Sequence, residues 1–393
     1  MRRSPLLPIF LIVLVDVLGM TIVYPLLTIY AEHFGARPLT ATLLVSSFAI
    51  CQLVSGPVLG ALSDRYGRRP ILLISQLGTL LGFVILARAD ALWMVFAGRI
   101  LDGATAGNLS IAQAYIADHT APEKRAQSFA LIGIAFGLGF ALGPVVSGAL
   151  AHHSLAAPFY MAACLSAASV LGTLFILPRE DRPSGPAREL SLAAYAGFFR
   201  RPALGRLLGQ FFVYMFTFSL FIGGFALFAE RTYTWHGHPF RPREIGFAFA
   251  LSAFVGLVVQ GGMIRRLVPK HGERRLAMIG FAASAIGYPL LGASAALGVL
   301  AAATVVSAFG NSLLRPTLTA LITRAADPSE QGAVLGLTQS LASITSTIAP
   351  PLAGFLIQHG HGDAWAYVLG GVNALGLVLI ATDQAGTTAA NSG

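Results

Sequence analysis

Apolar residues fill the chain in runs of about 20 residues, the length with which an α-helix crosses the ~30 Å hydrocarbon core of a bilayer. Short polar stretches separate these runs, which leaves no room for a separate soluble domain. We therefore expect an all-α membrane protein with 12 transmembrane helices. The predicted spans lie near residues 6–30, 39–62, 71–87, 91–117, 127–150, 156–177, 204–229, 244–267, 276–293, 297–322, 332–357 and 364–381.

The two halves of the chain repeat one arrangement. A shift of 205 positions lays LSDRYGRRPILLI over LVPKHGERRLAMI, and a later shift of 206 pairs Pro144 with Pro350 and Gly148 with Gly354. General likeness among transmembrane helices is the alternative explanation, but it accounts for matched apolar residues and not for matched prolines and glycines. The sequence predicts two pseudo-symmetric six-helix halves over 1–177 and 204–381, a cytoplasmic linker over 178–203 and a disordered tail over 382–393.

Composition and charge agree with this organisation. Hydrophobic residues make up 55% of the 393 residues and charged residues 11%, and the mean hydropathy of +0.72 excludes a soluble globular protein. The net charge of +9 could suggest nucleic-acid binding, but the basic residues sort by membrane side. Of 26 Lys and Arg, 19 fall on the side of the N-terminus when three at the ends of spans are counted with that side, 5 fall on the other side, and Arg99 and Arg315 lie deeper within spans. This asymmetry predicts cytoplasmic N- and C-termini, a lipid bilayer as partner and no nucleic acid.

Several other functions have no support in the sequence. There is no G-x-x-x-x-G-K-(S/T) nucleotide loop and no nucleophile and base spaced for catalysis, so we expect neither an enzyme nor a cofactor. His236 and His238 lack a further ligand, so we expect no metal. The first apolar run continues past Asp16 without a cleavage site, which indicates a retained helix and not a signal peptide.

The densest charge between two apolar runs lies in GALSDRYGRRP, residues 60–70, which must form a tight loop at a membrane face. This stretch resembles the loop between the second and third helices of the major facilitator superfamily, with the pattern G-x-L-(A/S)-D-R-x-G-R-(R/K). A plain basic loop that only sets topology is the alternative. The positions that match are Gly60, Leu62, Ser63, Asp64, Arg65, Gly67, Arg68 and Arg69.

Charged residues inside spans are candidates for function, because each costs at least ~2.5–3.5 kcal/mol on insertion scales. Asp16 lies about 15 Å into the first span, and Arg99 and Asp102 lie about 12 and 16 Å into the fourth. Arg99 can pair with Asp102 at i and i+3, or it can hold Asp16. We predict that Asp16, Arg99 and Asp102 form a proton-coupling site; a static ion pair that fixes helix packing is the alternative.

Further motifs narrow the resemblance. GRILDGATAG in the fourth span is similar to the family's R-x-x-Q-G signature, with Asp102 where glutamine is usual. DVLGMTIVYPLLT in the first span is similar to the start of tetracycline-type exporters, in the drug:proton antiporter group with 12 spanning helices. GFALGPVVSG in the fifth resembles the antiporter signature G-x-x-x-G-P-x-x-G-G. Its matching positions are Gly139, Gly143, Pro144 and Gly148, while Ser147 replaces one glycine.

The resemblance implies a gate on the cytoplasmic side. In the family, the aspartate of the loop lies near the start of the eleventh helix, where the helix dipole favours an anion. The loop is degenerate in the second half, where Asp64 becomes Pro269 and Arg68 becomes Glu273. We expect the gate to comprise Gly60, Asp64, Arg65, Gly67, Arg68, Arg69, Asp118 and Arg125.

An aromatic stripe along the seventh span suggests a cavity for lipophilic compounds, although such a stripe could also face lipid. Where tetracycline exporters carry a histidine and an aspartate in the second half, this chain has Gly256 and Ser284, which argues against tetracycline itself as substrate. Arg315 is expected to snorkel towards the cytoplasmic face. The predicted cavity residues are Tyr24, Asn108, Gln113, Gln210, Phe211, Tyr214, Phe218, Asn311 and Gln339.

These patterns together predict a monomeric, proton-coupled exporter of lipophilic small molecules or drugs in the bacterial inner membrane, with a small-molecule substrate and protons as partners. Two other functions stay open. One is a proton-linked carrier of a specific metabolite, such as a sugar or an organic anion. The other is a membrane sensor or scaffold that has lost transport.

Overall fold

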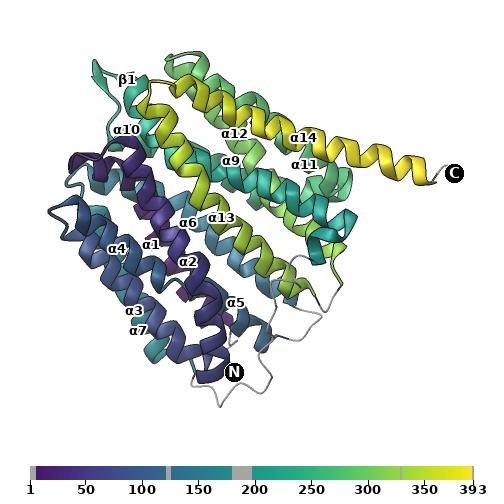
Figure 1. The fold of residues 1–393 in the computed structure, drawn as a ribbon, viewed down its shortest axis with the longest axis horizontal. Helices are drawn as coiled ribbons and strands as arrows, with labels where there is room; N and C mark the ends of the chain where they lie inside the picture. The colour runs from purple at the N-terminus through teal and green to yellow at the C-terminus, as the bar shows by residue number, and fades with distance from the viewer. Residues whose placement is uncertain (1–5, 121–124, 179–196, 328–329, 392–393) are drawn as a thin grey trace. The chain divides into compact units, whose positions relative to one another are not determined.

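The computed structural model describes residues 6–120, 125–178, 197–327 and 330–391, and they form helices almost throughout (Figure 1). Most of the predicted linker lies outside the described residues. In the first part of the chain the helices are α1 (Leu6–His33), α2 (Pro38–Tyr66), α3 (Arg68–Ala87), α4 (Leu92–Ala104), α5 (Asn108–Asp118), α6 (Arg125–Ala151) and α7 (Ala157–Phe175). In the second part they are α9 (Pro202–Thr232), α10 (Pro242–Val258), α11 (Ile264–Ala293), α12 (Leu297–Ala325), α13 (Gln331–Gln358) and α14 (Gly362–Asn391).

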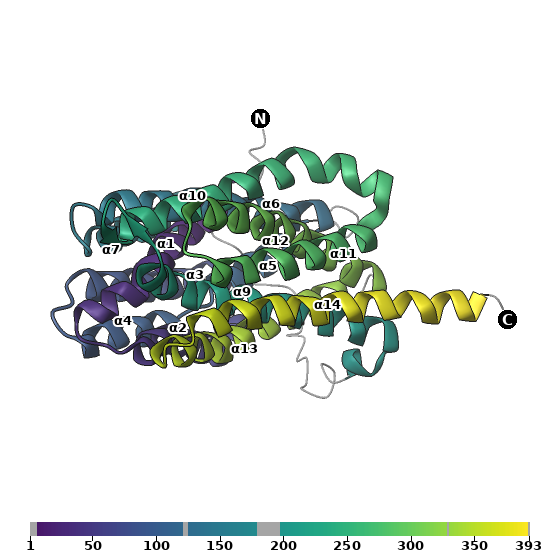
Figure 2. The same cartoon turned by 90° about the horizontal axis from the view of Figure 1, so that it is seen from above.

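The all-α prediction is confirmed, while the spanning stretches are divided differently. Ten stretches of the described chain are long and apolar enough to cross a membrane. One of them, Pro242–Ala293, holds the two predicted spans 244–267 and 276–293; it consists of α10, the π-helical turn Val259–Met263 and α11. This stretch is not one straight helix, because the backbone of Gly272 inside α11 is non-helical, with φ of 72° and ψ of 156°, and Figure 2 shows the stretch turning back on itself. α14 continues to Asn391, through residues for which the sequence predicts a disordered tail.

The predicted span 91–117 is interrupted between α4 and α5. Backbone groups freed inside a membrane protein must find partners within the protein. Ser75 of α3 supplies them, because its hydroxyl donates to the carbonyl of Thr105 and accepts from the amide of Gly107 at 2.9 Å. Gly78 leaves room for this approach, since a Cβ there would collide with the side chain of Thr105.

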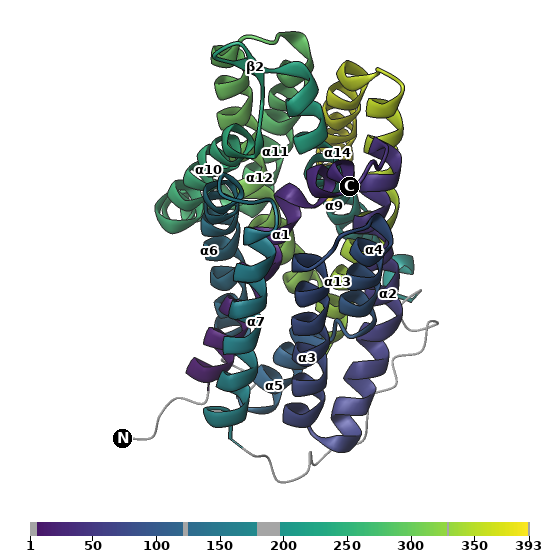
Figure 3. The ribbon, with the colours of Figure 1, turned by 90° about the vertical axis from the view of Figure 1, so that its left-hand side faces the viewer.

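The chain forms two compact units. Unit 1 comprises residues 1–188 and 241–250, and unit 2 comprises 189–240 and 251–393, so α10 begins in unit 1 and ends in unit 2. Within unit 1, α3 packs against α7 and α4, and α1 packs against α6 and α7 (Figure 3). Within unit 2, α11 packs against α12 and α14, and α9 packs against α13.

Among the described residues of unit 1, one apolar cluster includes Val23, Phe83 and Phe159, and another includes Val13, Leu72 and Ile111. Between these clusters, α1, α3 and α7 each carry buried polar residues, among them Thr21, Gln76 and Ser169. Unit 2 has a continuous cluster in which Phe211 and Tyr214 of α9 contribute, with Leu314 of α12. Unit 1 therefore carries a polar layer at the level where these apolar clusters end.

Two short connections show why particular residues are needed. β1 (Thr234–Trp235) and β2 (His238–Pro239) form a hairpin whose turn residues, His236 and Gly237, both have positive φ angles, as a type I′ turn requires. The expected loop between α2 and α3 is a single residue, Gly67, with φ of 100° and ψ of 149°. Asp64 and Arg65 therefore lie in the last turn of α2 and Arg68 begins α3.

Candidate functional site

Asp16 lies on α1 in the polar layer of unit 1. Both of its carboxylate oxygens are buried, and neither has a hydrogen-bond partner among the described residues. The polar side chains that face this carboxyl are Ser169, Asn108 and Gln76, with Asp102 close enough to act on it electrostatically. Gln76 Nε2 also donates to Ser169 Oγ at 2.8 Å. A titratable acid is thus held among neutral side chains that can donate or accept hydrogen bonds.

Arg99 pairs with Asp102 and not with Asp16, which decides between the two pairings left open by the sequence. Arg99 Nη1 donates to Asp102 Oδ2 at 2.8 Å, and both side chains are buried. The guanidinium stacks over Phe48 at 4.2 Å and lies 6.0 Å from the ring of Tyr24. Arg99 is therefore held by an anion and two aromatic faces, which fix its position in α4.

Two residues of this layer, Gln76 and Ser169, were missed by sequence reasoning. Gln76 stands in the run ILLISQLGTLL, so its polarity within an apolar span was a usable signal. Asn108 was predicted as a cavity residue; it begins α5, at the interruption after α4. Interrupted helices mark binding sites in several transporter folds, because they bring backbone and polar groups to the middle of the membrane.

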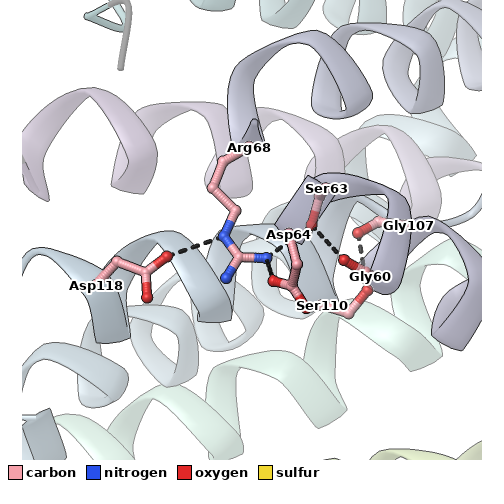
Figure 4. Close-up of polar contacts among 7 residues, drawn as sticks. All are labelled: Gly60, Ser63, Asp64, Arg68, Gly107, Ser110 and Asp118. Atoms are coloured by element: carbon pink, nitrogen blue, oxygen red, sulfur yellow. Dashed lines mark hydrogen bonds and ion pairs between the residues drawn. The ribbon is translucent and has the colours of Figure 1, made fainter. Parts of the chain in front are cut away.

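At one end of unit 1, Arg68 joins three helices (Figure 4). Its guanidinium pairs with Asp64 of α2 and donates to Ser63 Oγ at 2.7 Å and to Asp118 Oδ2 of α5 at 2.9 Å. The side chain of Arg68 is buried, whereas that of Asp118 is 45% exposed. The structure thus brings together Asp64, Arg68 and Asp118 as predicted for the gate, while the side chain of Arg125 lies outside the described residues.

Arg69 has a different role from Arg68. It donates to the carbonyls of Thr173 and Leu174, at 3.1 and 2.5 Å, and so caps the last turn of α7. Unit 2 repeats this contact, because Arg274, which the 205-residue shift aligns with Arg69, donates to the carbonyl of Ile380 in α14 at 3.0 Å. The internal repeat therefore extends to individual hydrogen bonds.

The ion pair of Arg68 also recurs in unit 2, with its charges exchanged. Glu273 stands where the shift places the counterpart of Arg68, and it pairs with Arg324 at the end of α12 at 2.6 Å. A shift of 206 aligns Arg324 with Asp118. The aligned glycine, Gly272, has a φ angle of 72°. The degenerate loop of the second half thus keeps both the bend and an ion pair of opposite polarity.

The glycines of α6 allow close packing against α1. A Cβ at Gly139 would lie 2.5 Å from Val17 Cγ1, and one at Gly143 would collide with Thr21. Thr21 Oγ1 donates to the carbonyl of Gly139 at 2.9 Å. Ser147, which replaces a glycine of the signature, donates to the carbonyl of Ile22 at 2.5 Å. This face of α6 therefore positions the part of α1 that carries Asp16.

The predicted cavity residues occur in both units. In unit 1, Tyr24 lies beside Arg99 and Asn108 beside Asp16, while Gln113 is half-buried on α5. In unit 2, the side chains of Gln210, Phe211 and Tyr214 are buried, and Phe218, Asn311 and Gln339 are half-buried.

The aromatic stripe of the seventh span lies on α9, where four of its eight residues are buried and none is exposed, which argues against a lipid-facing stripe. The buried residues are Phe211, Tyr214, Phe225 and Phe228, and the half-buried ones are Phe212, Phe216, Phe218 and Phe221. Towards the end of α9, Phe228 packs on Trp365 with ring centres 4.9 Å apart. Phe221 lies farther from Trp365, at 6.3 Å. That end of the stripe therefore belongs to the core of unit 2.

Comparison with known proteins identifies the class. A model of the Major Facilitator Superfamily matches residues 9–270 and 238–391. The chain belongs to this superfamily, and its relatives are membrane transporters and not enzymes. The resemblance that the sequence motifs indicated is therefore confirmed, and the chain is a multi-pass membrane protein.

Particular relatives are resistance proteins. Tetracycline resistance protein, class C, of Escherichia coli is 32% identical over 349 residues, which cover 86% of this chain and 84% of that protein. Multidrug resistance protein 2 of Bacillus subtilis is 28% identical over 363 residues, or 89% of each chain. The crystal structure of the human organic anion transporter MFSD10 (TETRAN) has a TM-score of 0.73 at 24% identity and covers 96% of this chain. The chain is thus a transporter homologous to tetracycline and multidrug resistance proteins.

Proposed function

We propose that this protein is a proton-coupled exporter of lipophilic small molecules, working by alternating access between its two halves in a bacterial inner membrane. The observation that carries the proposal is the buried carboxyl group of Asp16, which faces Ser169, Asn108 and Gln76 of the polar layer in unit 1. The names of the relatives, which include multidrug and tetracycline resistance proteins, support the export of drugs.

Asp16 is the proposed proton carrier because its immediate neighbours suit either protonation state. A carboxylate accepts hydrogen bonds and a carboxylic acid also donates one, and the amides and hydroxyl of Gln76, Asn108 and Ser169 can serve both forms. Asp102 is less suited, because Arg99 already holds it. We therefore assign Arg99 and Asp102 to positioning, and Asp16 to proton exchange.

The proposed cytoplasmic gate uses the Arg68 network. Arg68 fixes the end of α2 to the end of α5 through Asp64 and Asp118, so these helices move as one body. Gly67 sets the bend between α2 and α3, and Arg69 ties α3 to α7. Opening of the cytoplasmic side would then change how this rigid end meets the other half.

The test uses purified protein in liposomes that enclose a pH-sensitive dye. Tetracycline, ethidium and a neutral lipophilic drug are added to wild type, Asp16→Asn and the control Asp90→Asn, which removes the same charge from an exposed turn. We expect drug-dependent proton flux in wild type and in the control, and its loss in Asp16→Asn. Asp16→Glu should retain part of the flux, because it keeps the carboxyl.

The other outcomes would either exclude Asp16 from the mechanism or favour a different function. Unchanged flux in Asp16→Asn would remove Asp16 from the coupling step. Absence of drug-dependent flux together with saturable uptake of one polar compound would favour a metabolite carrier. A protein that moves nothing and whose stability no ligand changes would be a sensor or scaffold.

A further inference from the structure

Arg315 is half-buried in unit 2 and stands away from the ends of its helix. α12 has 29 residues, about 43 Å, so it is longer than the bilayer core, and Arg315 stands about 15 Å from its last residue. Arg315 would reach the cytoplasmic face by snorkelling only if α12 began at the edge of the bilayer core. The charge of Arg315 instead acts on Tyr214, which stands about 18 Å into α9.

Three helices of unit 2 bring polar groups together around Arg315. Asn311, one turn before Arg315 on α12, donates a hydrogen bond from Nδ2 to the hydroxyl of Tyr288 on α11. The hydroxyls of Tyr288 and Tyr214 are close enough to interact electrostatically. A guanidinium, two phenols and an amide thus form one group, which we call the Arg315 cluster.

Several buried polar atoms at this cluster have no hydrogen-bond partner among the described residues. They are Oδ1 of Asn311, Oγ of Ser284, and both Oε1 and Nε2 of Gln210. Gln210 is fully buried and stands one turn before Tyr214 on α9, while Ser284 stands one turn before Tyr288 on α11. Buried polar groups are normally satisfied, so their concentration here indicates a place for a polar ligand group.

Aromatic rings adjoin the cluster. The ring of Phe221 lies 5.4 Å from that of Tyr288, and the ring of Phe218 lies 6.3 Å from that of Tyr214. A ligand that reaches Arg315 would therefore place its apolar body against aromatic faces.

We propose that the Arg315 cluster binds the anionic group of an aromatic substrate, such as a carboxylate or a phenolate. Arg315 supplies a permanent positive charge with a donor fork that matches two oxygens. Tyr288, whose oxygen already accepts from Asn311, has its own proton left to donate. The same charge repels cations, so the substrate class is aromatic anions. This inference rests on the proposed export function, for which it names the substrate class.

The test measures binding to purified protein in detergent, without a proton gradient, by calorimetry. The probes are 2-naphthoate, 2-naphthamide and (2-naphthylmethyl)ammonium, which share one aromatic body and differ in charge. We expect wild type to bind the naphthoate roughly tenfold or more tighter than the amide, as a charge-assisted bidentate contact allows. Arg315→Gln should abolish this preference without changing the affinity for the amide.

Three further variants make the result specific. Arg324→Gln, on the same helix but exposed and paired with Glu273, should keep the preference. Arg315→Lys keeps the charge without the fork, so its preference should fall between wild type and Arg315→Gln. Tyr288→Phe should reduce the preference by a smaller factor, and it keeps the question answerable if Arg315→Gln does not fold.

Equal binding of the three probes by wild type, or tighter binding of the cation, would overturn the proposal. So would an Arg315→Gln variant that folds and loses affinity for naphthoate and amide equally, because Arg315 would then act on the fold alone. The measurement requires neither Asp16 nor a proton gradient. An anion preference in binding, without proton flux when 2-naphthoate is added to the liposomes, would therefore refute proton-coupled export but leave the binding preference of the Arg315 cluster intact.

Discussion

At the scale of single residues, three neighbours at the junction of α2 and α3 have separate physical roles. Gly67 adopts a backbone conformation that other residues avoid, Arg68 forms ion pairs with Asp64 and Asp118, and Arg69 caps α7. The sequence pattern groups them as one motif. Their contacts show that only Arg68 is a candidate for a switchable interaction, since the other two fix the backbone.

Gly67→Ala should destabilise the protein by about 1–3 kcal/mol, because φ of 100° with ψ of 149° lies in a region that is essentially restricted to glycine. Thermal unfolding in detergent measures the effect. Gly56→Ala is the matched control, since Gly56 lies within α2 with nothing within 4 Å of an added Cβ. Equal stability of the two variants would show that the junction relaxes easily.

At the scale of helices, the close packing of α6 on α1 depends on glycines of α6, which have no side chain. Gly139 and Gly143 lie directly against Val17 and Thr21, and Ser147 adds a hydrogen bond to Ile22. Small residues at such spacing let transmembrane helices approach closely. Because α1 carries Asp16, this contact also sets the position of the proposed proton carrier.

Gly143→Ala should therefore destabilise the protein by about 1–3 kcal/mol through overpacking, since the added methyl meets both the side chain and the backbone of Thr21. It should also lower drug-dependent proton flux by shifting α1. Gly133→Ala, on the same helix with open space around it, should be neutral or stabilising. The expectation fails if both variants unfold at the same temperature as wild type.

The charge-exchanged ion pairs allow a reciprocal test. Glu273→Arg should destabilise unit 2 by about 0.5–1 kcal/mol or more, because it places two cations together and Arg324 is largely exposed. Adding Arg324→Asp to Glu273→Arg gives the same arrangement of charges as Arg68 and Asp118, so the double variant should regain most of the lost stability. Thermal unfolding of the two single variants and the double variant gives the coupling. Additive effects of the two substitutions would mean that the ion pair contributes nothing to stability. Arg266→Glu, at an exposed position of the same unit, controls for a change of surface charge.

At the scale of the whole molecule, the boundary between the units does not follow the chain. Residues 241–250, at the start of α10, pack with unit 1, where Gly246 meets Gly148 of α6 backbone to backbone. A Cβ on either glycine would lie 2.9 Å from the Cα of the other. Unit 1 is therefore incomplete without a segment that follows the linker in sequence.

This organisation predicts the behaviour of a divided chain. Residues 1–188 expressed alone should be less stable in detergent than the same fragment coexpressed with residues 189–393, because the face of α6 around Gly148 then lacks its cover. Size-exclusion profiles before and after mild heating measure the difference. The coexpressed fragments should recover drug-dependent proton flux. An isolated first fragment that is as heat-resistant as the coexpressed one would contradict the role of residues 241–250.

Much of this protein follows from the sequence alone, because a membrane restricts what each residue can do. Apolar runs of spanning length determine the all-α fold, and charge that cannot lie in hydrocarbon determines where helices end. Asp16, Arg99 and Asp102 were recognisable as candidates because charge within a span is costly. The repeat of 205 residues was visible in the sequence, and it locates the second bend at Gly272.

The tertiary structure decided what depends on how helices rotate and meet. It paired Arg99 with Asp102, interrupted the span at Thr105–Gly107 with Ser75 as partner, and placed Gln76 and Ser169 beside Asp16. It also joined Glu273 to Arg324 across 51 positions. Hydrophobic periodicity does not fix these contacts, because each joins two helices whose relative rotation is set by side-chain packing along their whole length.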